Sequence, residues 1–208
     1  ASRLDAHHAE IESSLEGTDT YALIRTGVSL SVGEEIGEHF GLLVAAEQGY
    51  FEEVMELSSG VDEGSFFSGA EGEALLGRVL AGQLGAEVGQ ELIVLGRTQD
   101  GSPSPLKLSV QGIVNGGNSL ADRQVYVPLD EGQWLADVED AATEILVYGE
   151  GYLAADALAE DLRAMPGLQA FSVTSWKERD PYRGIYTTVS LVFGVLAFIV
   201  VFVTALGV

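Results

Sequence analysis

The sequence predicts an α+β fold of two subdomains, followed by a helix that spans a membrane. Three observations support this prediction. Short segments among residues 1–183 alternate apolar with polar residues, as half-buried strands do. Segments between them carry apolar residues at helical spacing. Residues 185–208 contain no charged residue, and a helix of that length measures roughly 36 Å, more than the ~30 Å hydrocarbon core of a bilayer requires.

The N-terminal part of the chain predicts one helix and two strands. Residues 3–16 show an amphipathic helical pattern, which Gly17 interrupts. Residues 21–32 alternate apolar residues with serines and predict a half-buried strand. Residues 40–46 are apolar and predict a second strand. The expected connections are an acidic turn, a helical turn and a polar loop, at residues 33–39, 50–55 and 58–68.

The middle of the chain predicts a short helix and a hairpin. A helix is expected over residues 78–84, because Gly77 precedes it and Gly85 is suited to end it. Residues 91–97 and 106–114 predict two strands joined by a polar loop with an Asp-Gly turn signal. A short apolar run, a turn, a further strand and a short helix are expected at residues 74–76, 115–118, 124–129 and 131–137.

The last block before the apolar segment predicts a strand, a helix and a strand, at residues 144–148, 153–165 and 168–173. Two parallel strands joined by a helix form a right-handed crossover unit. This unit needs partner strands from the N-terminal part of the chain. We therefore expect two subdomains that meet near residues 65 and 140, followed by a membrane helix at 184–208.

The charge of the chain limits its partners. It has 32 Asp and Glu residues against 10 Lys and Arg, a net charge of −22. This surface repels phosphate backbones, so nucleic acid is excluded as a partner. It also repels anionic lipid headgroups, so residues 1–183 are expected to stand away from the bilayer. The acidity fits either a saline environment or a specific partner. The absence of cysteine excludes disulfides and thiolate chemistry.

The acidic part of the chain is expected on the outer side of the cell (inner) membrane. Cytoplasmic flanks of membrane helices are enriched in Lys and Arg, whereas the region before the apolar segment is acidic. Tyr182 and Tyr186 lie where an interfacial aromatic belt is expected. No cation follows Val208, which suggests a fragment of a longer membrane protein. An export signal is then expected upstream of Ala1.

The sequence contains no pattern that argues strongly for catalysis. A metal site normally needs three or four ligands with supporting groups around them. His7 and His8 with Glu12 offer only part of such a set, and an acidic turn is the preferred interpretation of Glu34, Glu35, Glu38 and His39. No phosphate loop or nucleophile elbow accompanies the glycines and serines. We therefore expect no catalytic, cofactor-binding or metal-binding residue.

The two tryptophans have structural interpretations. Trp134 lies in a predicted short helix and is expected in the core. Trp176 precedes the apolar segment, with Lys177 and Arg179 beside it. Packing at the base of the domain is preferred for Trp176, and a place at the membrane interface is the alternative.

Several short motifs carry a family resemblance. They are GYFEEV at 49–54 with GSFF at 64–67, EALLGRVLA at 73–81 with LGAEVGQ at 84–90, the strand at 108–114 with VYVPL at 125–129, and SW at 175–176 before the apolar segment. In this order and at this spacing, they resemble the extracytoplasmic region of FtsX-like, MacB-type ABC transporter permeases, which include macrolide exporters and lipoprotein-release permeases. Gln90 departs from the family pattern, which has an acidic residue there.

The resemblance implies a porter-like subdomain of residues 1–64 and 141–183, interrupted by a mostly β subdomain at residues 65–140. It also implies a role in force transmission. In this family, a cytoplasmic ABC ATPase subunit hydrolyses ATP, and membrane helices carry the motion to paired outer domains. The implied partners are that ATPase, a second permease copy or homologue, and a periplasmic adaptor or lipoprotein carrier. The implied substrate is a lipoprotein, a peptide or a drug, and the outer domain itself is not an enzyme.

Two other functions compete with the transporter hypothesis. The first is a membrane-anchored extracytoplasmic binding or adhesion domain without an ATPase partner. The second is an anchored hydrolase, whose histidine chemistry would have to use His7, His8 or His39. Further membrane helices after Val208 would favour the permease over the simple anchor.

Overall fold

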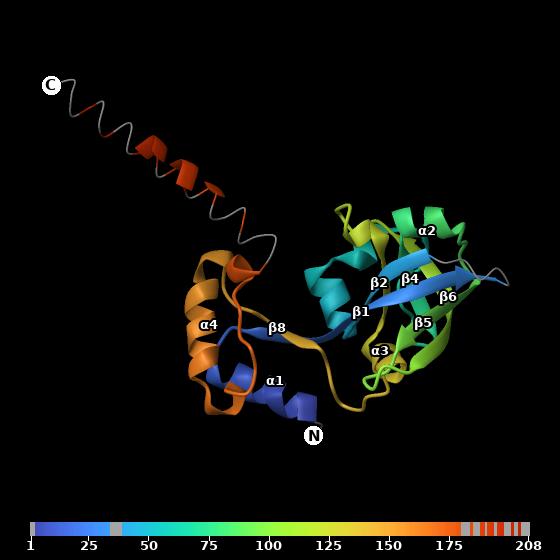
Figure 1. Cartoon of the computed structure of the whole chain (residues 1–208), viewed down its shortest axis with the longest axis horizontal. Helices are drawn as coiled ribbons and strands as arrows, with labels where there is room; N and C mark the ends of the chain where they lie inside the picture. The colour runs from blue at the N-terminus through green and yellow to red at the C-terminus, as the bar shows by residue number, and fades with distance from the viewer. Residues whose placement is uncertain are drawn as a thin grey trace. The chain divides into compact units, whose positions relative to one another are not determined.

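The computed structural model describes residues 3–33 and 39–179, together with isolated positions between 184 and 204 (Figure 1). The chain divides into two compact units. Unit 1 comprises Ala1–Glu12 and Asp19–Val147, and unit 2 comprises Ser13–Thr18 and Tyr148–Val208. Helix α1 (Arg3–Ser14) begins in unit 1. The predicted subdomain boundaries near residues 65 and 140 stay a prediction.

Six strands of unit 1 form a mixed sheet that closes on itself, here called the closed sheet. Its order is β2-β7-β4-β6-β5-β1, and β1 pairs back with β2. β2 with β7 and β4 with β6 are parallel, and the other neighbours in this circuit are antiparallel. The strands are β1 (Asp19–Val32), β2 (His39–Ala46), β4 (Glu73–Gly77), β5 (Glu91–Arg97), β6 (Pro103–Val114) and β7 (Gln124–Pro128). The α+β prediction is confirmed.

Two further strands attach to the closed sheet. β8 (Glu144–Tyr148) pairs with β1, and β3 (Val61–Gly64) pairs antiparallel with β6. The strand predicted at 144–148 is therefore confirmed. β3 lies inside the segment predicted as a polar loop, and that part of the prediction is wrong. Its sequence VDEG has no second apolar residue to signal a strand, and its pairing with β6 supplies the missing stability.

Alternation along the strands fills one side of the closed sheet with apolar side chains. β6 is the clearest case, since Ser104, Leu106, Leu108 and Val110 are buried while the residues between them are exposed or partly exposed. Buried apolar residues of β1, β2, β4, β5 and β7 pack with these β6 leucines and Val110 in one hydrophobic cluster. Each fully buried aliphatic side chain contributes about 2 kcal/mol through removal of apolar area from water.

A second, aromatic cluster packs under two short helical turns, η1 (Tyr50–Val54) and η2 (Leu57–Gly60). Phe51 lies at its centre and is completely buried. The Phe51 ring centroid is 5.5 Å from that of Phe67, 5.8 Å from that of Tyr50 and 5.8 Å from that of Tyr126. The helical turn predicted at 50–55 is confirmed.

Two helices complete unit 1. α2 (Arg78–Leu84) ends at Gly85, whose φ of 63° is the left-handed conformation expected of a glycine cap. α3 (Leu129–Ala136) turns its buried residues, Gly132 and Leu135, toward the core. Trp134 is 59% exposed, so the prediction that it lies in the core is wrong. The small Gly132 approaches Ala45 of β2, and Trp134 lies two residues further along the helix on a different face.

Unit 2 contains the helix α4 (Ala155–Ala164) with the short turns η4 (Tyr152–Ala154), η5 (Pro166–Leu168) and η6 (Trp176–Glu178). The second strand predicted at 168–173 is wrong, because these residues form a turn followed by irregular chain. The guanidinium of Arg163 donates to the Val173 carbonyl at 2.8 and 3.1 Å. This side chain thus satisfies a carbonyl that a strand partner would otherwise bind.

Polar contacts link residues 175–177 of unit 2 to helix α4. Lys177 Nζ and Ser175 Oγ both donate to the Asp156 carboxylate, at 2.7 and 2.9 Å. These contacts, Lys177 first, hold the pKa of Asp156 below its ordinary value. Trp176 is 39% exposed, and the Lys177 ammonium lies 5.8 Å from its ring centroid.

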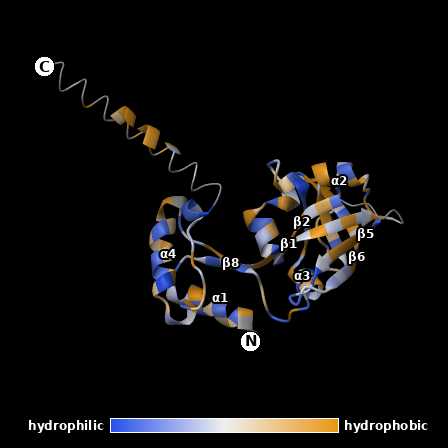
Figure 2. Ribbon diagram, viewed as in Figure 1, coloured by the Kyte–Doolittle hydropathy of each residue, from blue (hydrophilic) through white to orange (hydrophobic). Residues whose placement is uncertain are grey.

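Among the described residues, no helix is both long enough and apolar enough to cross a membrane. The helix predicted at 184–208 lies mostly outside the described residues, as does the turn predicted at 33–39 except for Gly33 and His39. Most of the described positions beyond residue 188 are hydrophobic (Figure 2). Leu191, Phe193 and Val201 among them are more than 60% exposed, at 64%, 67% and 65%.

Candidate functional site

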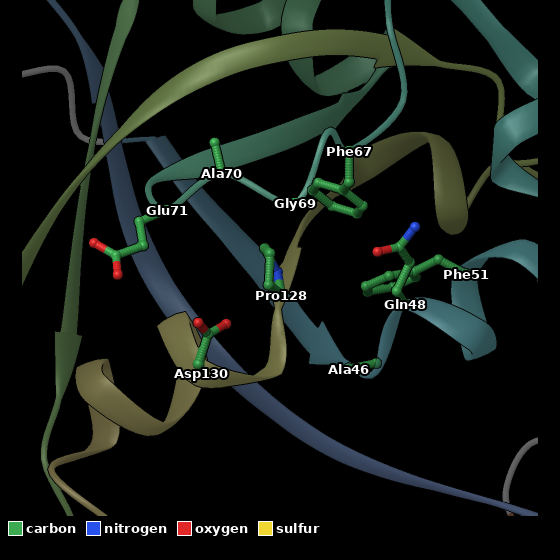
Figure 3. Close-up of a pocket in the computed structure, with 9 residues that line it drawn as sticks. All are labelled: Ala46, Gln48, Phe51, Phe67, Gly69, Ala70, Glu71, Pro128 and Asp130. Atoms are coloured by element: carbon green, nitrogen blue, oxygen red, sulfur yellow. The ribbon is translucent and has the colours of Figure 1, made fainter.

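A small pocket lies where the parallel strands β2 and β7 end. Ala46 and Pro128, their last residues, are direct neighbours in the register. In open α/β sheets, ligands bind beyond the carboxyl ends of parallel strands, where the connecting segments diverge, and β2 and β7 place two such ends side by side in this closed sheet. Here the chain continues from β2 toward η1, and from β7 into α3. The pocket has a volume of about 100 Å³ (Figure 3).

The pocket combines an apolar floor with a polar rim. Its lining residues are Ala46, Gln48, Phe51, Phe67, Gly69, Ala70, Glu71, Pro128 and Asp130. Phe51 and Phe67 are 0% and 8% exposed. The carboxylates of Glu71 and Asp130 lie on one side of the pocket and the amide of Gln48 on the other (Figure 3).

The wall formed by residues 68–73 is held at both ends. Ser68 donates to the Glu73 carboxylate through its backbone N–H at 2.8 Å and its hydroxyl at 2.6 Å. The Gly72 N–H donates to Glu131 at 2.6 Å, and its carbonyl accepts from the Ser109 N–H at 2.7 Å. Gly69 and Gly72 have φ values of 88° and 75°, which only glycine adopts without strain. The wall is therefore preformed.

The rim of the pocket carries uncompensated negative charge. Within the described part of the chain, Glu71 and Asp130 accept no hydrogen bond and form no ion pair. Partial burial raises the pKa of the neighbouring Glu131, and the charges of Asp130 and Glu71 raise it further, against the hydrogen bond from Gly72. The negative charges of Glu71 and Asp130, which disfavour ionisation of Glu131, favour a cation in the pocket.

Replacing Glu131 by glutamine is expected to stabilise the protein at neutral pH by up to about 1 kcal/mol, after allowance for solvent screening. The folded pKa of Glu131 lies above the ordinary 4.5, so ionisation costs more in the folded than in the unfolded state. The native chain therefore loses stability as pH rises from 4.5 through the raised pKa, and Glu131→Gln removes this loss. Glutamine keeps an acceptor for the Gly72 N–H.

Urea unfolding curves of both proteins between pH 4 and pH 8 measure this difference. It should vanish toward pH 4, where Glu131 is protonated in both states. The exposed Glu160→Gln is the matched control and should leave stability unchanged at every pH. If Glu131→Gln changed the free energy of unfolding equally at pH 4 and at pH 8, the raised pKa of Glu131 would not be the cause.

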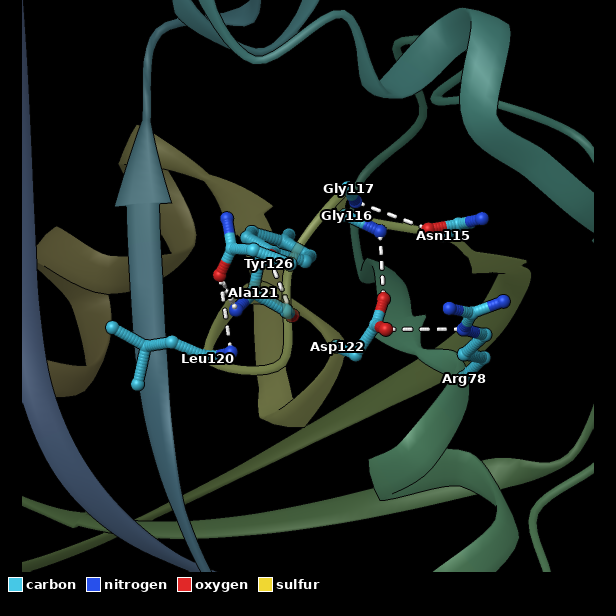
Figure 4. A network of polar contacts seen from close by, with 9 residues as sticks. Arg78, Asn115, Gly116, Gly117, Leu120, Ala121, Asp122 and Tyr126 are labelled. Carbon is cyan, nitrogen blue, oxygen red and sulfur yellow. Dashed lines mark hydrogen bonds and ion pairs between the residues drawn. The ribbon is translucent and has the colours of Figure 1, made fainter.

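A polar network centred on Asp122 supports the turn between β6 and β7 (Figure 4). The Asp122 carboxylate is buried and accepts from Arg78 Nε at 3.0 Å and from the Gly116 N–H at 2.8 Å. The buried Tyr126 hydroxyl donates to the Ala121 carbonyl at 2.7 Å, and burial raises the pKa of this phenol. Each of these polar groups has a hydrogen-bond partner within the chain, so the network has a structural role.

A second pocket, of about 240 Å³, lies among β1, the β5–β6 turn and residues 135–143. The two arginines in its lining, Arg25 and Arg97, already have partners within the chain. Arg25 contacts Glu144 at 3.2 Å and donates to the Tyr50 hydroxyl at 3.3 Å, while Arg97 donates to the Gly101 carbonyl at 3.1 Å. The pocket at the ends of β2 and β7 is therefore the better candidate for a ligand.

Those residues singled out in the sequence that the structure describes do not assemble into a metal site. The described residues contain no group of three or more His, Cys, Asp or Glu side chains that could hold a metal ion. His7 lies 4.0 Å from Glu10, and Glu34, Glu35 and Glu38 fall outside the described residues. The expectation of no catalytic, cofactor-binding or metal-binding residue stays a prediction.

The sequence did not reveal the pocket. Its lining comes from residues 46–51, 67–71 and 128–130, and no local pattern connects these three segments. Phe51 and Phe67 do lie in two of the motifs that carry the family resemblance, and Pro128 lies in a third. That coincidence was the only signal in the sequence that could have brought them together.

Comparison with solved structures identifies a protein of the same fold. The extracellular domain of YknZ, a noncanonic ABC-type transporter from Gram-positive bacteria, matches with a TM-score of 0.59 and 14% identity, over 83% of this chain and 86% of that one. A domain of a protein assigned as a permease in Porphyromonas gingivalis matches at a TM-score of 0.41 and 15% identity, over 82% and 72%, which is too distant to support a conclusion. No family model and no curated protein sequence matches. The chain thus has the fold of the extracellular domain of an ABC-type transporter.

Proposed function

We propose that the chain is the extracytoplasmic domain of an ABC transporter permease subunit, and that it transmits ATP-driven motion to export or extract a substrate. The observation that carries this proposal is the fold likeness to the YknZ extracellular domain, which extends over 83% of this chain and 86% of that domain. The motif order supports it. EALLGRVLA forms β4 and the first half of α2, and VYVPL forms most of β7 and the start of α3.

The mechanism needs a cytoplasmic ABC ATPase subunit and a second permease copy or homologue. Motion from the membrane would reach unit 2 first, because the apolar residues 185–208 belong to it. The chain passes between the two units after residues 12, 18 and 147, so unit 2 connects to unit 1 at three points. The six strands of the closed sheet leave no free edge in their circuit. This arrangement suits force transmission.

The substrate is a lipoprotein, a peptide or a drug, and the geometry favours contact through a surface. Sites for drug-sized ligands measure about 300–1,000 Å³. The two pockets described above measure about 100 and 240 Å³, which is too small to enclose such a ligand. Within the described part of the chain, a substrate would therefore be pushed or guided rather than enclosed.

The test uses the complete permease with its ATPase in lipid nanodiscs. Residues 1–183 are replaced by a short Gly-Ser linker, which removes the whole domain and leaves no half of the closed sheet behind. Assembly of the complex should persist, while coupling of ATP turnover to export should be lost. Unchanged turnover and unchanged export would refute force transmission and favour an anchored binding domain.

A labelling experiment tests the proposed location separately. The chain has no cysteine, so a single Gln169→Cys substitution in exposed, irregular chain provides a unique site. A membrane-impermeant maleimide should modify this cysteine in cells whose cell wall or outer membrane has been permeabilised but whose inner membrane is intact. Labelling only after lysis of the inner membrane would place the domain in the cytosol and would end the transporter proposal.

A further inference from the structure

We propose that the pocket at the ends of β2 and β7 is a binding site for one lysine side chain of a partner protein. The proposal does not depend on the transporter function. It rests on the size of the pocket, on its apolar floor and on the two free carboxylates at its rim. Nothing in the fold likeness assigns a role to this pocket.

The size of the pocket selects the kind of ligand. A volume of about 100 Å³ holds a few water molecules, each of which occupies about 30 Å³ in the liquid. It holds one long side chain and excludes a drug-sized molecule, whose sites begin at about 300 Å³. The wall at residues 68–73 is fixed by hydrogen bonds, so little ordering cost attends the insertion of a side chain.

The arrangement of apolar and charged groups matches a lysine. The Phe67 ring, which is 8% exposed, and the partly exposed Pro128 offer an apolar surface to a methylene stem. An ammonium group is a compact cation with three donors, so carboxylates at the rim of the pocket attract it. Glu71 and Asp130 lie on the same side of the pocket, and within the described chain neither has an ion-pair partner (Figure 3).

The lysines within residues 1–208 do not suit the pocket, and the charge of the chain favours a basic partner segment. The chain contains only two lysines, Lys107 and Lys177. Lys107 contacts Glu91 at 3.1 Å, and Lys177 contacts Asp156 at 2.7 Å. A second copy of this chain therefore has no unbound lysine to offer. A net charge of −22 attracts a basic partner segment.

The test is an NMR titration of residues 1–208 in neutral detergent at low salt. The probe is Nα-acetyl-lysine methylamide, and its neutral counterpart is Nα-acetyl-norleucine methylamide, which lacks the ammonium group. The lysine derivative should shift the amide signals of Ala46, Gly69 and Glu71 in a saturable way. Added salt should weaken binding, because exposed charges are screened.

The matched variants locate the binding. Glu71→Gln with Asp130→Asn should weaken binding of the lysine derivative by roughly fivefold, as expected for exposed ion pairs. Glu160→Gln with Asp161→Asn removes the same two charges from exposed positions of α4 and should leave binding unchanged. Equal weakening in both variants would show a general charge effect and would overturn the site.

Two further outcomes would also refute the proposal. Equal shifts with the norleucine derivative would show that the carboxylates play no part. Tighter binding of putrescine than of the lysine derivative would assign the pocket to a free diamine instead of a protein side chain. Retention of the native amide spectrum in both double variants confirms that any loss of binding reflects the pocket and not unfolding.

Discussion

Replacing Phe51 by alanine should lower the free energy of unfolding by about 3–5 kcal/mol, the range for deleting a fully buried aromatic ring. Phe51 is completely buried, and its ring contacts those of Tyr50, Phe67 and Tyr126. The loss combines removal of buried apolar area with the cavity that remains. Phe51 also forms part of the pocket floor, so lysine binding should weaken in the same variant.

Phe40→Ala is the matched control for this prediction. Phe40 lies on β2 in the same unit but is 80% exposed. Its replacement should change stability by less than about 0.5 kcal/mol. Urea unfolding followed by tyrosine fluorescence measures both variants. Similar losses for the two substitutions would mean that the aromatic cluster around Phe51 does not stabilise unit 1 as the structure indicates.

Replacing Gly77 by alanine should destabilise unit 1 by about 3 kcal/mol, the upper part of the range for overpacking. A Cβ at Gly77 would lie 2.5 Å from the Asp122 carbonyl carbon and 2.7 Å from the Ala121 carbonyl oxygen. Both are backbone atoms, so a rotamer change cannot relieve the contact. The turn would have to move, and the Arg78–Asp122 ion pair, 3.0 Å long, would be disturbed with it.

Gly82→Ala provides a control of opposite sign. Gly82 lies inside α2, and a Cβ there would meet no atom within 4 Å. Alanine in a helix interior is favoured over glycine by about 0.5–1 kcal/mol, so this variant should be more stable than the native protein. Thermal unfolding of the two variants should therefore move in opposite directions. A stabilising Gly77→Ala would contradict the close approach of Gly77 to the backbone of Ala121 and Asp122.

Local patterns predicted most elements of unit 1. The alternation in β1 and β6 reflects which side chains face the core, and the glycine after α2 marks the end of that helix. These features depend on neighbours within a few residues. β3 was missed because its stability comes from pairing with β6, about 50 residues further along the chain. The strand predicted at 168–173 failed because Arg163 and local turns satisfy its backbone.

The candidate site was beyond prediction from the sequence. Its rim carboxylates, Glu71 and Asp130, lie 59 residues apart in an acidic chain where nothing distinguishes them from other exposed acids. Only the parallel pairing of β2 with β7 brings the two strand ends together. Trp134 shows the same limit, since the face that α3 turns inward depends on Gly132 fitting against Ala45.

By itself, the sequence determined where most helices and strands lie, the acidic character of the surface and the long uncharged segment at the C-terminus. These follow from composition and periodicity, which are local properties. The tertiary structure decided that six strands close into one circuit, and that a pocket with an apolar floor and two free carboxylates forms at one end of it. The reason is physical: strand pairing and pocket lining join residues that are distant in the chain, and local periodicity carries no information about which distant segments pack together.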